Sequence, residues 1–235
     1  MNKTKFTKIS GPCAVESYEQ MIHAAKAIKD NIDILRAGAF KPRTNPNSFQ
    51  GLGEEGIKIL NRVGKEIGKP VITEVLDTRH VSLVNKYSDY LQVGARNMHN
   101  YELLKEVGKT GKTVVLKRGL AAKVSEWIMA SKYVSAGGSK VILCERGIRT
   151  FEDSTRFTLD LAGAMLAKIE YGLPVFVDPS HATGRKDLIA SMVRAIHSAG
   201  FDGVMIESHC CPVSAKCDGD QALEPDEYNS IISNL

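Results

Sequence analysis

Eight short apolar runs alternate with eight amphipathic stretches along this chain, and no other sequence feature constrains the fold as strongly. Several runs are continuously apolar, such as VVL, VIL, VFV and VMI, which is typical of parallel strands buried on both faces. The expected strands are Lys8–Cys13, Ile32–Phe40, Pro70–Leu76, Tyr90–Gly94, Thr113–Lys117, Lys140–Cys144, Pro174–Asp178 and Gly203–Ser208. The expected helices are Tyr18–Lys29, Glu54–Ile67, Arg79–Lys86, Tyr101–Val107, Ala121–Ser135, Ser154–Tyr171, Arg185–Ala199 and Glu224–Leu235.

Strict alternation without a linker predicts one α/β domain over residues 1–235, a single (β/α)8 TIM barrel. Glycines fall where the expected helices should stop, at Gly68, Gly108, Gly172 and Gly200. The alternative is a doubly wound open sheet, but no G-x-G-x-x-G turn supports it. We expect a catalytic barrel with no separate regulatory domain.

Composition narrows the class of protein. Aromatic residues make up 6% of the chain and the net charge is only +4, so nucleic acid is a poor candidate partner. The apolar runs are strand-length and Met1–Ser10 has no apolar signal core, so we expect no membrane association and a cytoplasmic location. Five cysteines, with Cys210 and Cys211 adjacent, do not resemble a disulfide framework and fit a reducing compartment.

Charged or metal-binding side chains follow every expected strand. They are Cys13 with Glu16, Arg36 with Lys41 and Arg43, Glu74, Arg96, Lys117 with Arg118, Glu145 with Arg146, Asp178 with His181, and Glu207 with His209. In a parallel barrel all strand ends meet at one rim, where barrel enzymes build their active sites. The sequence therefore predicts an active site at this rim.

The segment Leu35–Gly53 reads LRAGAFKPRTNPNSFQGLG and carries three cations on a loop that glycine and proline keep from forming a helix. With the cations at other strand ends, it predicts a site for a ligand with several negative charges, or for two anionic ligands. The expected binding cations are Arg36, Lys41, Arg43, Arg96, Lys117, Arg118 and Arg146. Lys117 has an alternative role, because a strand-end lysine can act as a Schiff-base nucleophile.

A second constellation combines one thiol, one imidazole and two carboxylates, from Cys13, His181, Glu207 and Asp218. This donor set suits a divalent Mn, Fe, Co or Zn ion and disfavours Mg²⁺ and Ca²⁺. A rival reading is a structural zinc site made by His209, Cys210, Cys211 and Cys217, although adjacent cysteines chelate awkwardly.

A third segment, Asp178–Gly184, reads as a strand end that turns directly into the helix Arg185–Ala199. Free amides at that helix start can add to a phosphate site, and Ser180 and Arg185 are candidate helpers.

The chain resembles a known enzyme family through several of these motifs. They are Gly11-Pro-Cys-Ala-Val-Glu-Ser17, Lys41-Pro-Arg-Thr44, Gly94-Ala-Arg96, Asp178-Pro-Ser-His181 and Glu207 followed by Asp218-Gly219. Together they are similar to the compact branch of 3-deoxy-D-arabino-heptulosonate 7-phosphate (DAHP) synthase, over nearly the whole chain. The Gly-Pro-Cys and Asp-Pro-Ser-His elements also occur in 3-deoxy-D-manno-octulosonate 8-phosphate synthase, whereas Lys-Pro-Arg-Thr discriminates between the two.

The resemblance implies a (β/α)8 barrel and a role for each matching residue. The implied metal ligands are Cys13, His181, Glu207 and Asp218. The implied phosphoenolpyruvate site is Arg36, Arg96, Lys117 and Arg146, and the implied erythrose 4-phosphate site is Lys41, Arg43 and Thr44. The chain departs from the family near the eighth strand, where the family usually reads Glu-Val-His-Pro and this chain has Glu207-Ser-His-Cys-Cys-Pro212.

The implied reaction joins phosphoenolpyruvate to erythrose 4-phosphate and releases phosphate. The expected catalytic residues are Lys41, which delivers a proton, and Glu74 or His181, which orients water. We expect a homo-oligomer, a dimer or a tetramer, and no inhibition by aromatic amino acids. The alternatives are the octulosonate synthase, a Schiff-base aldolase and a non-catalytic phosphosugar-binding barrel.

Overall fold

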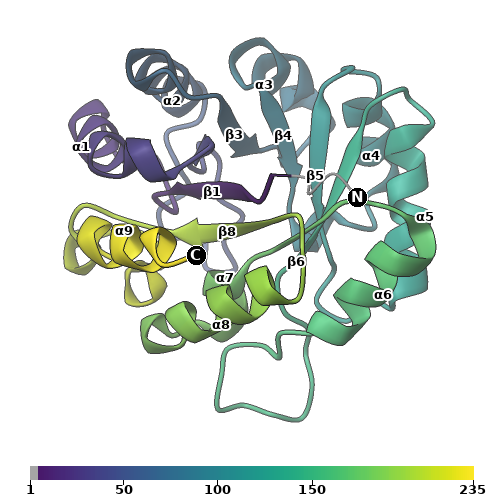
Figure 1. Ribbon diagram of the computed structural model, residues 1–235. Coiled ribbons are helices and arrows are strands. Elements are labelled where there is room, and N and C mark those ends of the chain that lie inside the picture. The colour runs from purple at the N-terminus through teal and green to yellow at the C-terminus, as the bar shows by residue number, and fades with distance from the viewer. Residues whose placement is uncertain (1–4) are drawn as a thin grey trace.

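Eight parallel strands close into a barrel in the order of the sequence (Figure 1). The structure is a computed structural model and describes residues 5–235. The strands are β1 (Thr7–Gly11), β2 (Ile34–Arg36), β3 (Val71–Glu74), β4 (Tyr90–Val93), β5 (Thr113–Lys117), β6 (Val141–Glu145), β7 (Val175–Val177) and β8 (Gly203–Glu207). The last strand pairs with the first, so the sheet has no free edge, and the predicted (β/α)8 fold is confirmed.

Helices cover the outside of the barrel (Figure 1). They are α1 (Tyr18–Ile28), α2 (Glu54–Ile67), α3 (Val81–Tyr87), α4 (Tyr101–Gly108), α5 (Val124–Ser135), α6 (Leu161–Tyr171), α7 (Pro179–Thr183), α8 (Lys186–Ser198) and α9 (Pro225–Ser233). Short 3-10 turns lie at Lys29–Asn31, Thr78–His80, Ala95–Asn97, Pro212–Ser214 and Gly219–Gln221. In the part of the chain described here, no helix has both the length and the apolar character needed to cross a membrane.

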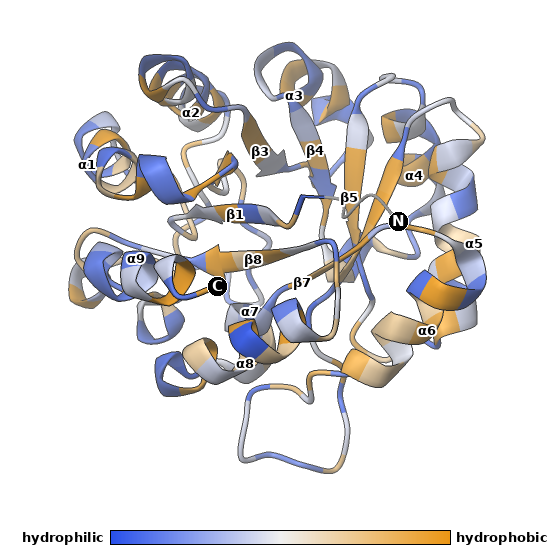
Figure 2. Ribbon diagram, in the orientation of Figure 1, coloured by the Kyte–Doolittle hydropathy of each residue, from blue (hydrophilic) through white to orange (hydrophobic). Residues whose placement is uncertain are grey.

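Apolar side chains fill two concentric layers. The inner layer lies inside the barrel and comes from the strand centres, with Ile9, Ile34, Ile72, Val115, Cys144, Phe176 and Met205. The outer layer is larger and lies between the sheet and the helices. Figure 2 shows the corresponding apolar strands and the mixed, amphipathic helices around them. Because both faces of each strand are buried, the strands need the continuous apolar runs seen in the sequence.

The largest departure from the expected helices is one that begins seven residues later than its pattern indicates. The helix expected over Ser154–Tyr171 starts only at Leu161, so that expectation is wrong for residues 154–160. The Asp160 carboxylate caps α6 by accepting from the Gly163 amide at 2.8 Å. The preceding residues bond elsewhere, since the amides of Arg156 and Phe157 donate to the carbonyls of Thr183 and Ala182. These bonds hold residues 154–160 as a loop at the rim of the barrel.

A short additional helix separates β7 from α8. The segment expected as a simple turn, Asp178–Gly184, contains α7, which Asp178 caps by accepting from the His181 amide at 2.9 Å. Pro179 at the first helical position and Gly184 in the left-handed region bound the helix. The extra turn places His181 over the end of the barrel.

Candidate active site

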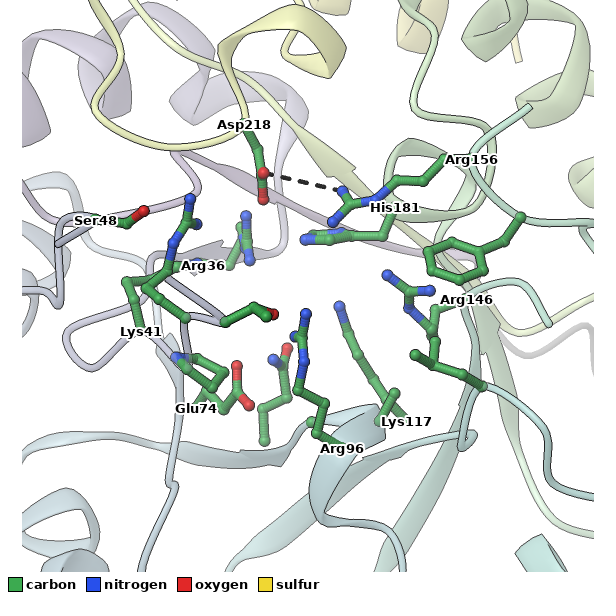
Figure 3. A pocket seen from close by; sticks show the side chains of 18 of the residues that line it. Arg36, Lys41, Ser48, Glu74, Arg96, Lys117, Arg146, Arg156, His181 and Asp218 are labelled. Atoms are coloured by element: carbon green, nitrogen blue, oxygen red, sulfur yellow. Dashed lines mark ion pairs between the residues drawn. The ribbon is translucent and has the colours of Figure 1, made fainter. Parts of the chain in front are cut away.

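A cavity of about 320 Å³ opens at the C-terminal rim of the barrel (Figure 3). Seven of its lining residues are cations, namely Arg36, Lys41, Arg43, Arg96, Lys117, Arg146 and Arg156. Only two lining residues, Glu74 and Asp218, are acidic. The predicted convergence of strand ends on one rim is therefore observed, and the cavity carries a strong excess of positive charge that suits anionic ligands.

Four potential metal-binding side chains meet at one side of this cavity. Cys13, His181, Glu207 and Asp218 each offer a ligand atom, and all four atoms lie within 4.8 Å of one another. Cys13 follows β1 and Glu207 ends β8, and the pairing of Gly11 with Glu207 in the sheet brings these two segments together. A thiol, an imidazole and two carboxylates fit a borderline divalent ion well.

The His181 ring is held in an orientation that suits a metal ligand. Nδ1 lies 2.7 Å from the Asp178 carboxylate, and Nε2 lies 3.2 Å from Glu207 Oε1. Because the contact at Nδ1 is the shorter of the two, the hydrogen of the neutral ring is assigned to Nδ1, which leaves the Nε2 lone pair facing the group. Burial lowers the pKa of His181, although Asp178 and Glu207 oppose the shift, and this favours the neutral ring that ligation requires.

The two carboxylates of the group are ionised. Burial alone would raise the pKa of Glu207, but the interactions with His181 and with the Arg36 guanidinium outweigh it and lower the pKa. Burial opposes ionisation of Asp218 in the same way, yet His181 and the Cys13 hydrogen bond bring its pKa to about 2. The group therefore presents two negative charges to a cation.

The Cys13 thiol has three polar neighbours. Its Sγ lies 3.2 Å from Cys217 Sγ, 3.2 Å from the Asp218 carboxylate and 2.9 Å from Lys41 Nζ. The hydrogen bond with Cys217, burial and the charge of Glu207 raise the pKa of Cys13 well above its ordinary value, and Lys41 opposes the rise. A metal ion that binds here displaces the thiol proton, so metal affinity must depend on pH.

Four of the seven cavity cations differ in whether they have a protein partner. Arg36 donates to Glu207 at 2.6 Å and Lys117 donates to Asp178 at 2.6 Å, so both are buried and paired. Among the described residues, Arg96 and Arg146 have no ion-pair or hydrogen-bond partner, and both line the cavity. Unpaired guanidinium groups that point into a cavity are well suited to hold a carboxylate or a phosphate.

The loop after β2 brings Lys41, Arg43 and Thr44 to the cavity wall. The Lys41 amide donates to the Gln50 carbonyl at 2.9 Å, which closes the loop on itself. Gly51 has a φ of 90°, and a Cβ there would collide with the Ala39 carbonyl, so only glycine fits this closure. Arg43 donates to Cys217 Sγ at 2.8 Å. The loop thus places two cations beside the metal-binding group.

Glu74 ends β3 and lines the cavity opposite the metal-binding group (Figure 3). Its carboxylate lies against Gly94, where an added Cβ would meet Glu74 Oε1. The lack of a side chain at Gly94 therefore leaves room for this carboxylate in the cavity.

Sequence reasoning missed several lining residues. Arg156 and Phe157 fall in the segment that we expected to be helical, so we did not expect them at the rim of the barrel. Gln92, Asn45 and Ser48 carry no charge and gave no signal beyond their position near strand ends or in the basic loop. Arg118 does not line the cavity, because it pairs with Glu145 and Asp160 at 3.0 and 2.7 Å.

Two further expectations are wrong. The rival zinc cluster does not form, since Cys211 is exposed, Cys210 Sγ faces the Gln20 carbonyl and Cys217 contacts Cys13 instead. Within residues 5–235 the group described above is the one cluster of ligand atoms close enough to share an ion.

The expected phosphate helpers after β7 are also wrong. The Ser180 hydroxyl is fully buried and accepts from the Glu207 amide at 3.0 Å. Arg185 is exposed and pairs with Asp187 at 2.7 Å. Neither side chain lines the active-site cavity, although Arg185 lines a second cavity of about 320 Å³ that shares Arg156 and Asp218 with it.

The fold and the site together define a class: a (β/α)8 barrel enzyme that handles anionic substrates next to a divalent-metal group. The family model described as the DAHP synthetase I family matches residues 2–234. The chain belongs to this family.

Similar proteins agree with this assignment. Phospho-2-dehydro-3-deoxyheptonate aldolase of Thermotoga maritima is 41% identical over 232 residues, which cover 98% of this chain and 69% of that protein. A crystal structure of the DAHP synthase of that organism has a TM-score of 0.95 and covers 98% of this chain and 68% of its own. A truncated form of the same synthase has a TM-score of 0.91, with 37% identity over 98% of this chain and 85% of its own. The 2-dehydro-3-deoxyphosphooctonate aldolase of Caulobacter vibrioides is 28% identical, over 100% of this chain and 88% of that protein.

Proposed function

We propose that this chain condenses phosphoenolpyruvate with erythrose 4-phosphate to DAHP and phosphate, the first step of the shikimate pathway. Membership of the DAHP synthetase I family and 41% identity to the Thermotoga maritima enzyme support this assignment. The observation that carries it is the Lys41–Thr44 loop, which lines the cavity beside the metal-binding group. Lys-Pro-Arg-Thr at this loop is the motif that separates this activity from that of the octulosonate synthase.

The metal would be held by Cys13, His181, Glu207 and Asp218, and their donor types favour divalent Mn, Fe, Co or Zn. When bound, such an ion polarises the aldehyde oxygen of erythrose 4-phosphate as a Lewis acid. The remaining chemistry is assigned to the side chains of this chain.

Phosphoenolpyruvate carries a phosphate and a carboxylate, and four cations are proposed to hold it. Within residues 5–235, Arg96 and Arg146 have no ion-pair or hydrogen-bond partner that would compete with the substrate, whereas Arg36 and Lys117 also neutralise Glu207 and Asp178. Arg43 and Thr44 are proposed to hold the phosphate of the second substrate. Fixing both anions in one cation-lined cavity offsets their mutual repulsion and aligns the enol carbon with the aldehyde.

Lys41 is proposed to deliver the proton that the new alkoxide needs. Burial alone would lower the pKa of Lys41, but the neighbouring Cys13 and Cys217 sulfurs raise it, so the side chain stays protonated and can act as an acid. Glu74 is the better candidate to orient the attacking water, because both nitrogens of His181 already face carboxylates. Water adds to the second carbon of phosphoenolpyruvate, and phosphate leaves.

The nearest competing activity is that of 2-dehydro-3-deoxyphosphooctonate aldolase, which relatives at 28–30% identity carry in their names. Phosphate release from phosphoenolpyruvate tests the choice, with erythrose 4-phosphate or arabinose 5-phosphate as the second substrate. We expect release with erythrose 4-phosphate, loss of release after chelation, and recovery on adding a divalent metal. Faster release with arabinose 5-phosphate would contradict the proposal, as would full activity in the chelated protein.

A further inference from the structure

The Glu207 carboxylate is fully buried, and its two oxygens have different partners. Oε1 accepts from Arg36 at 2.6 Å and lies 3.2 Å from His181 Nε2. Oε2 accepts from Gln221 Nε2 at 2.5 Å. Oε1 thus faces His181 and the rest of the metal-binding group, and Oε2 accepts a hydrogen bond from the Gln221 amide on the other side of the carboxylate.

The orientation of the Gln221 amide follows from its neighbours. Arg156 NH1 can only donate, and it lies 3.0 Å from Gln221 Oε1. The Glu207 carboxylate can only accept, so the amide nitrogen must face it. Gln221 is 3% exposed, so its amide depends mainly on these two protein partners for hydrogen bonds. A glutamine held between an obligate donor and an obligate acceptor has a single favourable orientation.

The backbone places Gln221 on the same short turn as another member of the metal-binding group. The 3-10 turn Gly219–Gln221 directly follows Asp218, whose φ of 53° lies in the left-handed region. A non-glycine residue in that region carries a small conformational cost, which is common at functional sites. The turn therefore presents Asp218 to the group from one end and supports Glu207 from the other.

Arg156 connects this turn to the substrate cavity. Its guanidinium lies 3.9 Å from Asp218 Oδ1, a contact drawn in Figure 3, and it lines the cavity together with Phe157. Arg156, Gln221 and Glu207 form one continuous chain of hydrogen bonds from the cavity wall to the metal-binding group.

We propose that Gln221 is a positioning residue that orients Glu207 for the divalent metal, with Arg156 as the anchor that fixes the amide. The inference rests on the proposed function only in that a metal binds at this group. Partners of this kind behind metal ligands typically contribute 10- to 100-fold to metal affinity. Gln221 itself touches neither substrate nor reacting atoms in this scheme.

The test compares two substitutions whose order of effect separates positioning from simple packing. Gln221→Leu keeps most of the volume and removes the donor to Glu207. Gln221→Glu is nearly isosteric and keeps the contact with Arg156, but it turns a carboxylate oxygen toward Glu207. If the side chain only filled space, Gln221→Glu would be the milder change. If it must donate to Glu207, Gln221→Glu is the more damaging one, since two like charges then meet in a buried site.

The measurement is the dissociation constant for Zn²⁺ and for Mn²⁺ on the metal-free full chain, by calorimetric titration. We expect affinity to fall about 10-fold or more in Gln221→Leu and further in Gln221→Glu. Gln20→Glu, the same change of charge on α1, serves as the matched control and should bind metal as the wild type does. Turnover of Gln221→Leu should recover at saturating metal, with the KM for both substrates little changed.

Equal metal affinity in the wild type and both variants would overturn the inference and leave the proposed function standing. Tighter binding by Gln221→Glu than by Gln221→Leu would also overturn it. A wild-type chain that binds neither ion would overturn the metal-dependent function and this inference together. Melting temperatures of all variants, measured without metal, show whether any loss of affinity comes from unfolding.

Discussion

Arg146 is a buried cation with no hydrogen-bond or ion-pair partner among residues 5–235, and the structure makes an unusual prediction for its removal. The side chain is 6% exposed, its NH1 has no hydrogen-bond acceptor, and its guanidinium lies 4.4 Å from the centre of the Phe157 ring. Burial and the nearby guanidiniums of Arg156 and Arg96 lower the pKa of Arg146, although Asp178 opposes the shift. We expect Arg146→Met to stabilise the anion-free protein while it weakens anion binding.

The change in the free energy of unfolding caused by Arg146→Met follows from two opposing contributions. An unsatisfied buried polar group costs about 1–3 kcal/mol, and more when it is charged. The contact with the Phe157 ring returns about 0.5–2 kcal/mol, and methionine preserves most of the packing of the stem. The net expectation is a free energy of unfolding about 1 kcal/mol higher in Arg146→Met, which raises the melting temperature by about 2–4 °C for a chain of this size.

Inorganic phosphate should reverse this order of stability. A ligand at 100 times its dissociation constant stabilises the state that binds it by about 2.7 kcal/mol. The wild type should gain this amount, whereas Arg146→Met should gain much less at the same phosphate concentration. The assay is urea denaturation with and without phosphate, followed by fluorescence of Trp127, which is fully buried.

Arg62→Met is a matched control, because Arg62 is an exposed arginine on α2 that pairs with Glu66. Its phosphate response should equal that of the wild type. The prediction is refuted if the free energy of unfolding of Arg146→Met, without phosphate, falls more than about 1 kcal/mol below that of the wild type. The cost of the unsatisfied buried charge and the gain from the Phe157 contact do not allow a larger loss. An equal phosphate response in Arg146→Met and the wild type would refute it as well.

Three further predictions concern the metal, the substrates and regulation. Cys13→Ser should remain folded, bind Zn²⁺ at least 10-fold more weakly and lose turnover. Cys217→Ser, which changes the neighbouring thiol, should keep metal binding. Equal titration curves for the two variants would count against Cys13 as a ligand. Lys41→Ala should lower kcat more than it raises the KM for phosphoenolpyruvate, and Arg96→Ala should do the reverse; steady-state kinetics with both substrates varied would expose equal effects on both parameters. Millimolar Phe, Tyr or Trp should leave the rate of the purified 235-residue chain unchanged at subsaturating substrates, and saturable inhibition by any of them would reveal a second site.

The number and order of the strands, and the longer helices between them, could be predicted from the sequence because these depend on local pattern, whereas the short helix α7 was not expected. Continuous apolar runs form strands that are buried on both faces, and β5 and α2 have the predicted bounds, Thr113–Lys117 and Glu54–Ile67. The candidate metal-binding group was predictable for a related reason. Once the strands are parallel and in sequence order, Cys13 and Glu207 must share a rim, although 194 positions separate them.

Which rim arginines are paired with a carboxylate, and which are not, could not be predicted from the sequence. Arg36, Arg118 and Arg146 all follow or end strands, yet Arg36 pairs with Glu207, Arg118 is withdrawn to Glu145, and Arg146 is left free in the cavity. The choice depends on a few ångströms of side-chain position, set by strand register and by the caps of α6 and α7.

The sequence by itself determined the barrel and the kinds of side chain at its rim. Continuous apolar runs mark the buried strands, amphipathic stretches mark the helices, and their alternation gives the order of the strands. Only the tertiary structure decided that Gln221 stands behind Glu207 and that Arg156 holds it. Glutamine has no charge and no periodic position to mark it, and its role exists only because two loops from different strands meet. Hydrogen-bond partners that lie far apart in the chain are selected by packing of the whole barrel, and that packing has no local signature.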